Sequence, residues 1–346
     1  NMVITIAAAI FVFGILVLVH ELGHFAAAKF TGMRVDEFAI GFGPRLLSFT
    51  KGETVYSLRA VPLGGFNDIA GMEESNNDAG IRGYCEKPII SRMLVILAGS
   101  FMNFLLPIVL FFGIFLYAGV STPSPEPVFG TVIAGKPAYE AGLQKGDRVL
   151  AVDGKEVNSW QDFVAAIKDS AGNTVSIKVS RDGQTIDTSL TPIYDHEAKR
   201  AMVGVMGSVD TIHPGFFESL WLAVQKTAAI IMMMLGALWK IVMELSGAEL
   251  AGPLGVAQMA GEVAQLGMVP LLNFAAFLSL NLGIVNLFPI PALDGGHFAG
   301  LCVEAVRGKP MGPKALEYTQ KFGIALLVLL MLLATKNDII RIFTGG

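Results

Sequence analysis

Charged residues and cysteines are both scarce in this chain of 346 residues. Lys, Arg, Asp and Glu make up 16% of it and hydrophobic residues 53%, whereas soluble domains carry about 25% charged residues. The two cysteines, Cys85 and Cys302, provide neither a disulfide framework nor the spacing of a metal site. A net charge of −4 is too small to indicate a nucleic-acid partner. With a mean hydropathy of +0.59, much of the chain is predicted to lie in lipid.

Several uncharged stretches are long enough to predict transmembrane helices. They are residues 3–19, which continue as an apolar segment to residue 30, and residues 93–120, 266–293 and 322–335. The first stretch has no positive residue before Lys29, so it lacks the n-region of a signal peptide and is predicted to remain as a helix. A fifth candidate, residues 227–239, is bounded by Lys226 and Lys240, and its length does not decide whether it spans.

The distribution of positive residues predicts the topology. No Lys or Arg precedes residue 29, whereas residues 29–92 contain eight, so the N-terminus is predicted outside and this loop in the cytoplasm. Residues 121–216 then lie outside. If the fifth candidate does not cross, Asp294 ends near the cytoplasmic face; if it crosses, Asp294 lies about 30 Å away on the other side. We therefore predict that residues 217–245 are interfacial and that four helices span.

Residues 121–216 predict a small soluble α+β domain, because short β-like runs alternate with turn signals such as residues 153–154 (DG). The run 130–157, which contains AGLQKGD at residues 141–147, resembles a PDZ domain. PDZ domains accept an extended peptide along a sheet edge. The resemblance implies that residues 129–131 lie near the loop that meets a peptide terminus. A domain that only restricts access is the alternative.

A metal-binding motif, His20-Glu21-Leu22-Gly23-His24, lies inside the first apolar segment. On a helix the two imidazoles share one face and can share a metal, and Glu21 can reach a metal-bound water. A catalytic zinc needs a third protein ligand and an open position; it then lowers the pKa of water to about 7, within reach of a general base. Polar groups in a spanning segment are costly unless ligated, paired or hydrated. A metal site is therefore favoured over a satisfied polar cluster between helices.

The third ligand is predicted to be Asp294, which follows an otherwise uncharged stretch at the depth predicted for the histidines. Its approach contains Pro289 and Pro291, which must break the helical ladder. Freed backbone groups at membrane depth are tolerated only where they are buried or face a wet cavity, so a broken helix beside an acid indicates the wall of a site. An interfacial acid at a helix end is the alternative. His297 is predicted to lie nearby without binding the metal.

Taken together, the motifs of the chain resemble the site-2 protease family of intramembrane zinc metalloproteases, closest to its bacterial regulator-of-sigma-E type in a single-PDZ form. They are HELGH, residues 41–43 (GFG), residues 62–66 (PLGGF), the PDZ-like run, residues 252–255 (GPLG) and residues 286–296 (NLFPIPALDGG). The resemblance implies one zinc per chain, bound by His20, His24 and Asp294, with Glu21 as the catalytic base. It also implies that Asn286 contacts the substrate backbone.

The same resemblance places a membrane re-entrant β-hairpin at residues 53–66. Its predicted substrate-binding residues are Pro62, Leu63, Gly64, Gly65 and Phe66. An edge strand there would receive the backbone groups that a helical substrate exposes when it unwinds in lipid. Two features depart from the family pattern. Only one PDZ-like domain fits between residues 121 and 216, and residues 67–68 (ND) replace the apolar and basic residues of many relatives.

The predicted fold is a polytopic α-helical membrane protein with about four transmembrane helices, an inserted extracytoplasmic α+β PDZ domain and a re-entrant β-hairpin. The predicted parts are residues 1–120, the first membrane part; 121–195, the PDZ-like domain with its core at 128–192; 196–265, a linker and interfacial region; and 266–346, the second membrane part.

The resemblance implies an intramembrane zinc endopeptidase of the bacterial cytoplasmic (inner) membrane, with its active site near the cytoplasmic side. The implied substrates are single-span membrane proteins, such as anti-sigma factors, and leftover signal peptides. Its predicted partners are the lipid bilayer, these substrates and extended peptides at the PDZ domain, with no nucleic acid. Two other hypotheses stay open: a non-catalytic membrane adaptor that recruits partners through the PDZ domain, and a metal or proton transporter, which no inverted repeat supports.

Overall fold

The structure is a computed structural model that describes residues 2–72, 80–195, 200–244, 252–310 and 312–344. The chain divides into two compact units. The membrane unit comprises residues 1–117 and 215–346, and the inserted unit comprises residues 118–214. Each unit is described by itself.

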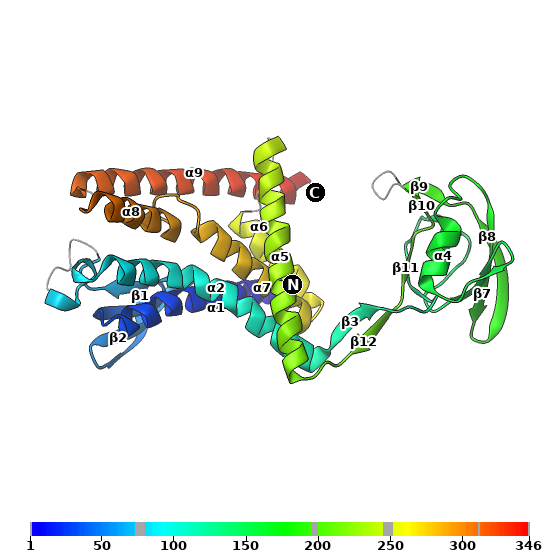
Figure 1. The fold of residues 1–346 in the computed structure, drawn as a ribbon, viewed down its shortest axis with the longest axis horizontal. Helices are drawn as coiled ribbons and strands as arrows, with labels where there is room; N and C mark the ends of the chain where they lie inside the picture. The colour runs from blue at the N-terminus through cyan, green and yellow to red at the C-terminus, as the bar shows by residue number, and fades with distance from the viewer. Residues whose placement is uncertain (1, 73–79, 196–199, 245–251, 311, 345–346) are drawn as a thin grey trace. The chain divides into compact units, whose positions relative to one another are not determined.

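Helices build most of the membrane unit (Figure 1). Their bounds are α1 (Met2–Phe30), α2 (Ile89–Ala118), α5 (Phe216–Glu244), α6 (Pro253–Gln265), α7 (Met268–Asn286), α8 (Asp294–Arg307) and α9 (Pro313–Thr344). Within the described residues, five stretches are long and apolar enough to cross a membrane: Met2–Phe30, Ile89–Ala118, Phe216–Ile241, Met268–Asn286 and Lys314–Asp338. Four of these stretches correspond to the predicted spanning segments, and the remaining one, Phe216–Ile241, lies in α5.

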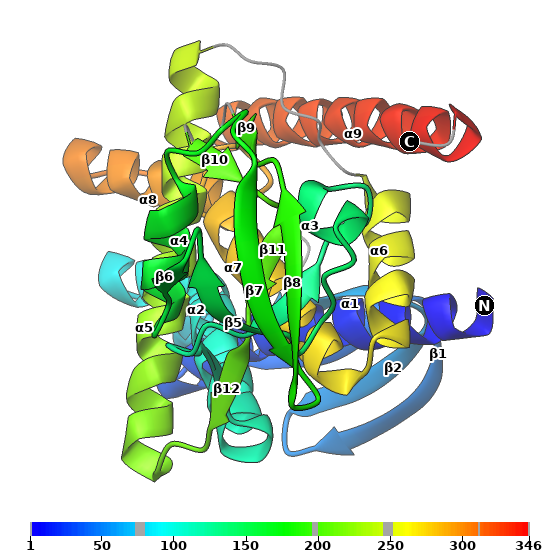
Figure 2. The same cartoon turned by 90° about the vertical axis from the view of Figure 1, so that its right-hand side faces the viewer.

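Helix α5 is longer than the apolar stretch between its two lysines. It has 29 residues and includes Lys226, whose Nζ lies 4.3 Å from the centroid of the Phe111 ring and donates a hydrogen bond to Asn273 Oδ1 at 2.8 Å. Because α2 and α7 supply these partners, the ammonium group is accommodated inside the helix and does not end it. Figures 1 and 2 both show α5 running across the direction of α1 and α2 rather than along it.

The GPLG motif of residues 252–255 opens helix α6 and joins it to α9. The backbone N–H groups of Gly252 and Gly255 donate hydrogen bonds to the buried carboxylate of Asp338 at 3.0 and 2.8 Å. A carboxylate at this end satisfies N–H groups that have no partner within the helix and interacts favourably with the helix dipole. The motif therefore anchors α9 to α6 at one point near the C-terminal end of the chain.

Two long strands, β1 (Val35–Lys51) and β2 (Thr54–Ile69), follow α1. Residues 37–40 pair with residues 65–68 on one side and 55–58 on the other, and residues 45–51 pair with residues 54–59. The strands therefore fold back on themselves and make a sheet wider than a simple hairpin. The predicted re-entrant hairpin falls inside this sheet, and its depth in a membrane stays a prediction.

A buried carboxylate, Glu37, holds this fold-back together. It accepts hydrogen bonds from Arg45, Ser57 and Arg59. Burial by itself would raise the pKa of Glu37, but these three hydrogen bonds and the charge of Arg59 outweigh it and lower the pKa to about 2. The Arg59 guanidinium also lies 4.8 Å from the centroid of the Phe66 ring. The cluster thus links the fold-back to the part of β2 that is predicted to bind the substrate.

The substitution Glu37→Gln is expected to destabilise the protein at neutral pH and to do so less as the pH falls. Because the pKa in the folded protein, about 2, lies below the ordinary value of 4.5, the ionised carboxylate stabilises the fold fully above pH 4.5 and loses this contribution as the pH falls toward 2. We expect a cost of about 1–3 kcal/mol near neutral pH. Thermal unfolding of the wild type and the variant in one detergent, from about pH 7 to about pH 3, measures the difference. A difference that does not shrink on acidification would contradict the assignment.

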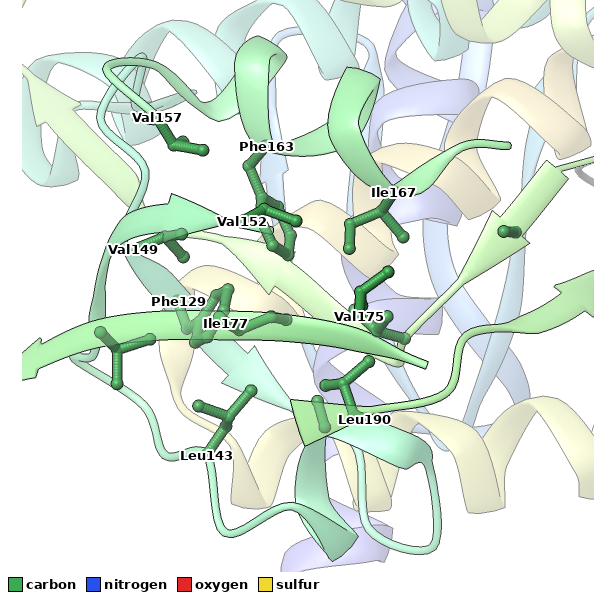
Figure 3. Close-up of a cluster of buried hydrophobic side chains, with 14 residues drawn as sticks. Phe129, Leu143, Val149, Val152, Val157, Phe163, Ile167, Val175, Ile177 and Leu190 are labelled. Carbon is green, nitrogen blue, oxygen red and sulfur yellow. The ribbon is translucent and has the colours of Figure 1, made fainter. Parts of the chain in front are cut away.

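Strands dominate the inserted unit. Its elements are β3 (Val120–Pro123), β4 (Phe129–Val132), α3 (Pro137–Glu140), β5 (Arg148–Val152), β6 (Lys155–Glu156), α4 (Trp160–Ile167), β7 (Val175–Arg181), β8 (Gln184–Leu190), β9 (Ile193–Asp195), β10 (Arg200–Met202), β11 (Val205–Gly207) and β12 (Val209–Ile212). A sheet of order β6-β5-β7-β8 packs with β4 and α4 around an apolar core, in which Phe129, Phe163 and Ile177 are buried (Figure 3). The unit continues to residue 214, past the predicted boundary at 195, because β11 pairs with β4 and β12 with β3.

The AGLQKGD motif ends in Asp147, whose side chain is fully buried. It accepts hydrogen bonds from the Gln144 backbone N–H at 2.8 Å and from Arg181 Nε at 2.7 Å, which fixes the loop between α3 and β5. Strand β4 pairs with β11 on one side, while Phe129 N–H bonds to Asp147 O at 2.9 Å on the other. Phe129 is therefore bonded on both sides, and the expectation that residues 129–131 lie near a peptide-binding loop stays a prediction; β11 is the other strand of this two-stranded sheet.

Candidate metal centre

Three side chains from two distant parts of the chain converge beside α1. The Nε2 atoms of His20 and His24 lie 3.2 Å apart, and Asp294 Oδ2 lies 3.5 and 3.6 Å from them. Donor atoms placed tetrahedrally at the usual zinc distances of about 2.0–2.1 Å are about 3.3 Å from one another. The spacing therefore fits one zinc ion, and the structure brings together the three residues predicted as its ligands. His297 lies in the same helix as Asp294 but is not in this cluster.

The hydrogen bonds of the two imidazoles also fit a metal at their Nε2 atoms. His24 Nδ1 lies 2.8 Å from Val95 O; a carbonyl only accepts, so His24 carries its proton on Nδ1 and Nε2 keeps a lone pair. His20 Nδ1 lies 3.1 Å from Asn103 Nδ2, while Asn103 Oδ1 is buried without a partner among the described residues. Turning this amide over lets Asn103 Oδ1 accept a hydrogen bond from His20 Nδ1–H and leaves the lone pair of His20 Nε2 free for zinc.

The approach to Asp294 differs from the prediction in one respect. The helix that precedes it, α7, ends at Asn286, and Asp294 is the first residue of a separate helix, α8, rather than the end of the uncharged helix. The intervening loop folds tightly over the start of α8: a Cβ added to Gly295 would lie 2.3 Å from Leu287 O. Pro289 and Pro291 cause the break, because neither has a backbone N–H to continue the ladder.

Helix α2 approaches the histidines more closely than any side chain would allow. A Cβ added to Gly99 would lie 2.3 Å from His24 Nε2 and 2.8 Å from His20 Cε1. Asn103 lies one helical turn further and is fully buried. Neither Gly99 nor Asn103 was predicted from the sequence as part of the site. The signal available was a glycine and an amide at positions i and i+4 of an uncharged membrane helix, where a buried polar group needs a partner.

The remaining predicted site residues lie in β2 and at the end of α7. A Cβ added to Gly65 would lie 3.1 Å from Glu21 Cγ, so β2 runs directly against the predicted base. Gly64 and Phe66 flank it in the strand. The side chains of Pro62 and Leu63 lie outside the described residues. Asn286, the last residue of α7, is buried, and its contact with a substrate stays a prediction.

Comparison with known proteins identifies the family. The family model described as Peptidase family M50 matches residues 8–330. The chain belongs to this family. It is 34% identical to the regulator of sigma-W protease RasP of Bacillus subtilis, over 98% of this chain and 99% of that protein. It is also 34% identical to a putative zinc metalloprotease of Clostridium perfringens, over 96% of this chain and 97% of that protein.

Solved structures also match part of the chain, among them a PDZ domain. The PDZ domain of an SdrC-like protein of Listeria monocytogenes has 21% sequence identity and a TM-score of 0.22, and the match covers 25% of this chain and 93% of that one. The sequence resemblance to site-2 proteases is thus confirmed by the family match and by relatives over nearly the whole chain. The protein is a metalloprotease of the M50 family, similar over nearly its whole length to proteins named RasP zinc metalloproteases, and several of its helices are able to span a membrane.

Proposed function

We propose that this M50 peptidase cleaves single-span membrane proteins within the inner membrane of a bacterium. The observation that carries the proposal is the placement of His20, Glu21 and His24, next to Asp294, in a helix of 29 residues that is long and apolar enough to cross a membrane. A peptidase site at this depth favours substrates that are themselves embedded. Remnant signal peptides and anti-sigma-factor-like proteins are the proposed classes.

In the proposed mechanism His20, His24 and Asp294 hold one zinc ion. When bound there, the ion supplies a Lewis acid that lowers the pKa of a water molecule to about 7. Glu21 would take a proton from the attacking water on a carboxylate oxygen as the water oxygen bonds to the scissile carbonyl carbon, and would give it to the amide nitrogen as the C–N bond breaks. Val95 O holds the proton of His24 on Nδ1, so the imidazole keeps its Nε2 lone pair throughout.

The proposed substrate site is the part of β2 that runs along Glu21. A helical substrate keeps every scissile amide inside its own hydrogen-bond ladder, and unwinding it in lipid exposes unsatisfied backbone groups. Gly64, Gly65 and Phe66 would receive these groups as a neighbouring strand does and present one carbonyl to the metal. Asn286, at the end of α7, is proposed to hold the substrate backbone on the other side.

We also propose where helix α5 and the inserted unit lie relative to the membrane. Because α5 runs across the direction of α1 and α2 (Figure 2), we propose that it lies along the membrane interface, where Trp221 and Trp239, 61% and 66% exposed, suit the headgroup region. This keeps four spanning helices. The inserted unit is proposed to lie outside the cytoplasm and to bind an extended peptide at the free edge of β11.

A substrate with a weak helix near the cleavage site is expected to be cleaved at least about 10-fold faster than a matched poly-Leu substrate, because less backbone ordering must be undone. Purified protein in liposomes, loaded with one zinc per chain, is given two synthetic transmembrane peptides that differ only by a Gly-Pro or Leu-Leu pair. A chelator should stop both reactions, and added zinc should restore them. Equal rates for the two peptides would contradict the unwinding step, and no cleavage of either would contradict the proposed function.

A further inference from the structure

Asn67, one of the two residues of β2 that depart from the pattern of many relatives, contacts the predicted base directly. Its Nδ2 donates two hydrogen bonds to Glu21, one to the carboxylate Oε2 at 2.7 Å and one to the backbone O at 2.8 Å. Both partners only accept, so the nitrogen of the amide must face Glu21, unlike the amide of Asn103. Both N–H groups of Asn67 Nδ2 therefore donate to a single residue of α1, Glu21.

This pair of bonds fixes the orientation of the Glu21 side chain. A glutamate in a helix can rotate about three side-chain torsions, and its carboxylate then samples many positions. The bond to Oε2 holds one carboxylate oxygen against β2, while the close approach of Gly65 to Glu21 Cγ limits the stem of the side chain. The other carboxylate oxygen accepts no hydrogen bond from the residues that the structure describes, so its lone pairs are available for a proton.

The amide of Asn67 is satisfied on its nitrogen but not on its oxygen. Asn67 Oδ1 is buried and has no hydrogen-bond partner among the residues that the structure describes. Burying an unpaired amide oxygen costs free energy, which an apolar side chain of similar size would avoid. The unpaired oxygen of Asn67 therefore costs free energy, while both hydrogen bonds that its nitrogen donates go to Glu21.

We infer that Asn67 is a positioning residue, which aims the general base Glu21 from the strand that holds the substrate. The inference rests on the proposed function, in which Glu21 takes a proton from water. It assigns to β2 a second task beside substrate binding: the strand that receives the substrate also sets the position of the base. Positioned general bases contribute roughly 10²–10⁴-fold to rates, so a misaligned base should lose about 10–100-fold in kcat.

Two nearly isosteric variants test this inference, Asn67→Leu, which donates nothing, and Asn67→Asp, which also repels the carboxylate of Glu21. We expect kcat to fall about 10–100-fold in Asn67→Leu and further in Asn67→Asp. The KM for a transmembrane peptide should stay within about 3-fold, because the main-chain edge of β2 is unchanged. The neighbouring substitution Asp68→Asn, whose side chain points to the other face of the strand, serves as the matched control and should change kcat by less than about 2-fold.

Two readouts do not depend on turnover. Zinc per chain should remain one in both variants, since Asn67 contacts none of the three ligands in the structure. The zinc-loaded Glu21→Gln protein should capture the uncleaved peptide with the same affinity with and without Asn67→Leu. Wild-type kcat in Asn67→Leu, loss of zinc, or weakened capture in proportion to the lost rate would each overturn the inference. If the wild-type protein cleaves nothing, the proposed function fails instead, which is a separate result.

Discussion

The substitution Glu21→Gln is expected to abolish cleavage of a transmembrane peptide while one zinc stays bound per chain. Gln has the shape of Glu and can still accept the hydrogen bond from Asn67, but its amide cannot take a proton from water. The loss should be at least about 10²–10⁴-fold, the usual contribution of a general base. Cleavage assays on gels and metal analysis of the same preparations measure both quantities.

This variant separates an enzyme from a membrane adaptor with a structural metal site. The ligand atoms of His20, His24 and Asp294 are untouched by it, so zinc content and thermal unfolding should match the wild type. Cleavage that persists in Glu21→Gln would contradict the role of Glu21. Loss of zinc together with activity would show that the residue supports the metal site rather than the proton transfer.

The substitution Gly99→Ala is expected to remove zinc and activity together. The added Cβ would lie 2.3 Å from His24 Nε2 and 2.6 Å from His24 Cε1, well inside contact distance, and the ring cannot move away without leaving the position set by Val95 O. Displacing the ligand atoms should weaken zinc binding by at least the 10–100-fold that loss of a supporting contact costs. Titration with a competing chelator measures the affinity.

Helix α2 offers a matched control in Gly113→Ala. A Cβ at Gly113 meets nothing within 4 Å among the described residues, while both substitutions should raise helix propensity by the same amount. We expect Gly113→Ala to retain full zinc affinity and activity. If Gly99→Ala binds zinc as the wild type does, the close packing of α2 on the histidines is wrong.

Much of the site could be predicted because the spacing of its residues along the chain indicates which side chains can share a metal. His20 and His24 share a helix face at i and i+4, and Asp294 was the one acid after a long uncharged stretch broken by two prolines. The structure brings these three groups together. The predicted helix over residues 266–293 was wrong at its C-terminal end, because α7 ends at Asn286 and Asp294 is the first residue of α8. The length of an uncharged stretch does not show where one helix ends at a proline and the next begins.

The length of α5 shows a second limit of pattern reasoning. The apolar stretch predicted from the sequence, residues 227–239, is bounded by Lys226 and Lys240, and an isolated ammonium group is costly in an apolar setting. In the structure Phe111 and Asn273, from α2 and α7, surround that group and the helix continues. Hydropathy counts a charge by its type alone, whereas its cost depends on partners that other helices supply.

By itself, the sequence determined the family, and it predicted the three side chains that converge beside α1 and an inserted α+β unit, because each of these was indicated by short local motifs. Only the tertiary structure decided what holds the HELGH motif in place. Asn67 is 46 residues from Glu21, Val95 is 71 from His24, and Asn103 is 83 from His20. Such contacts have no periodicity or spacing that one sequence can reveal, since they arise from the packing of β2 and α2 against α1.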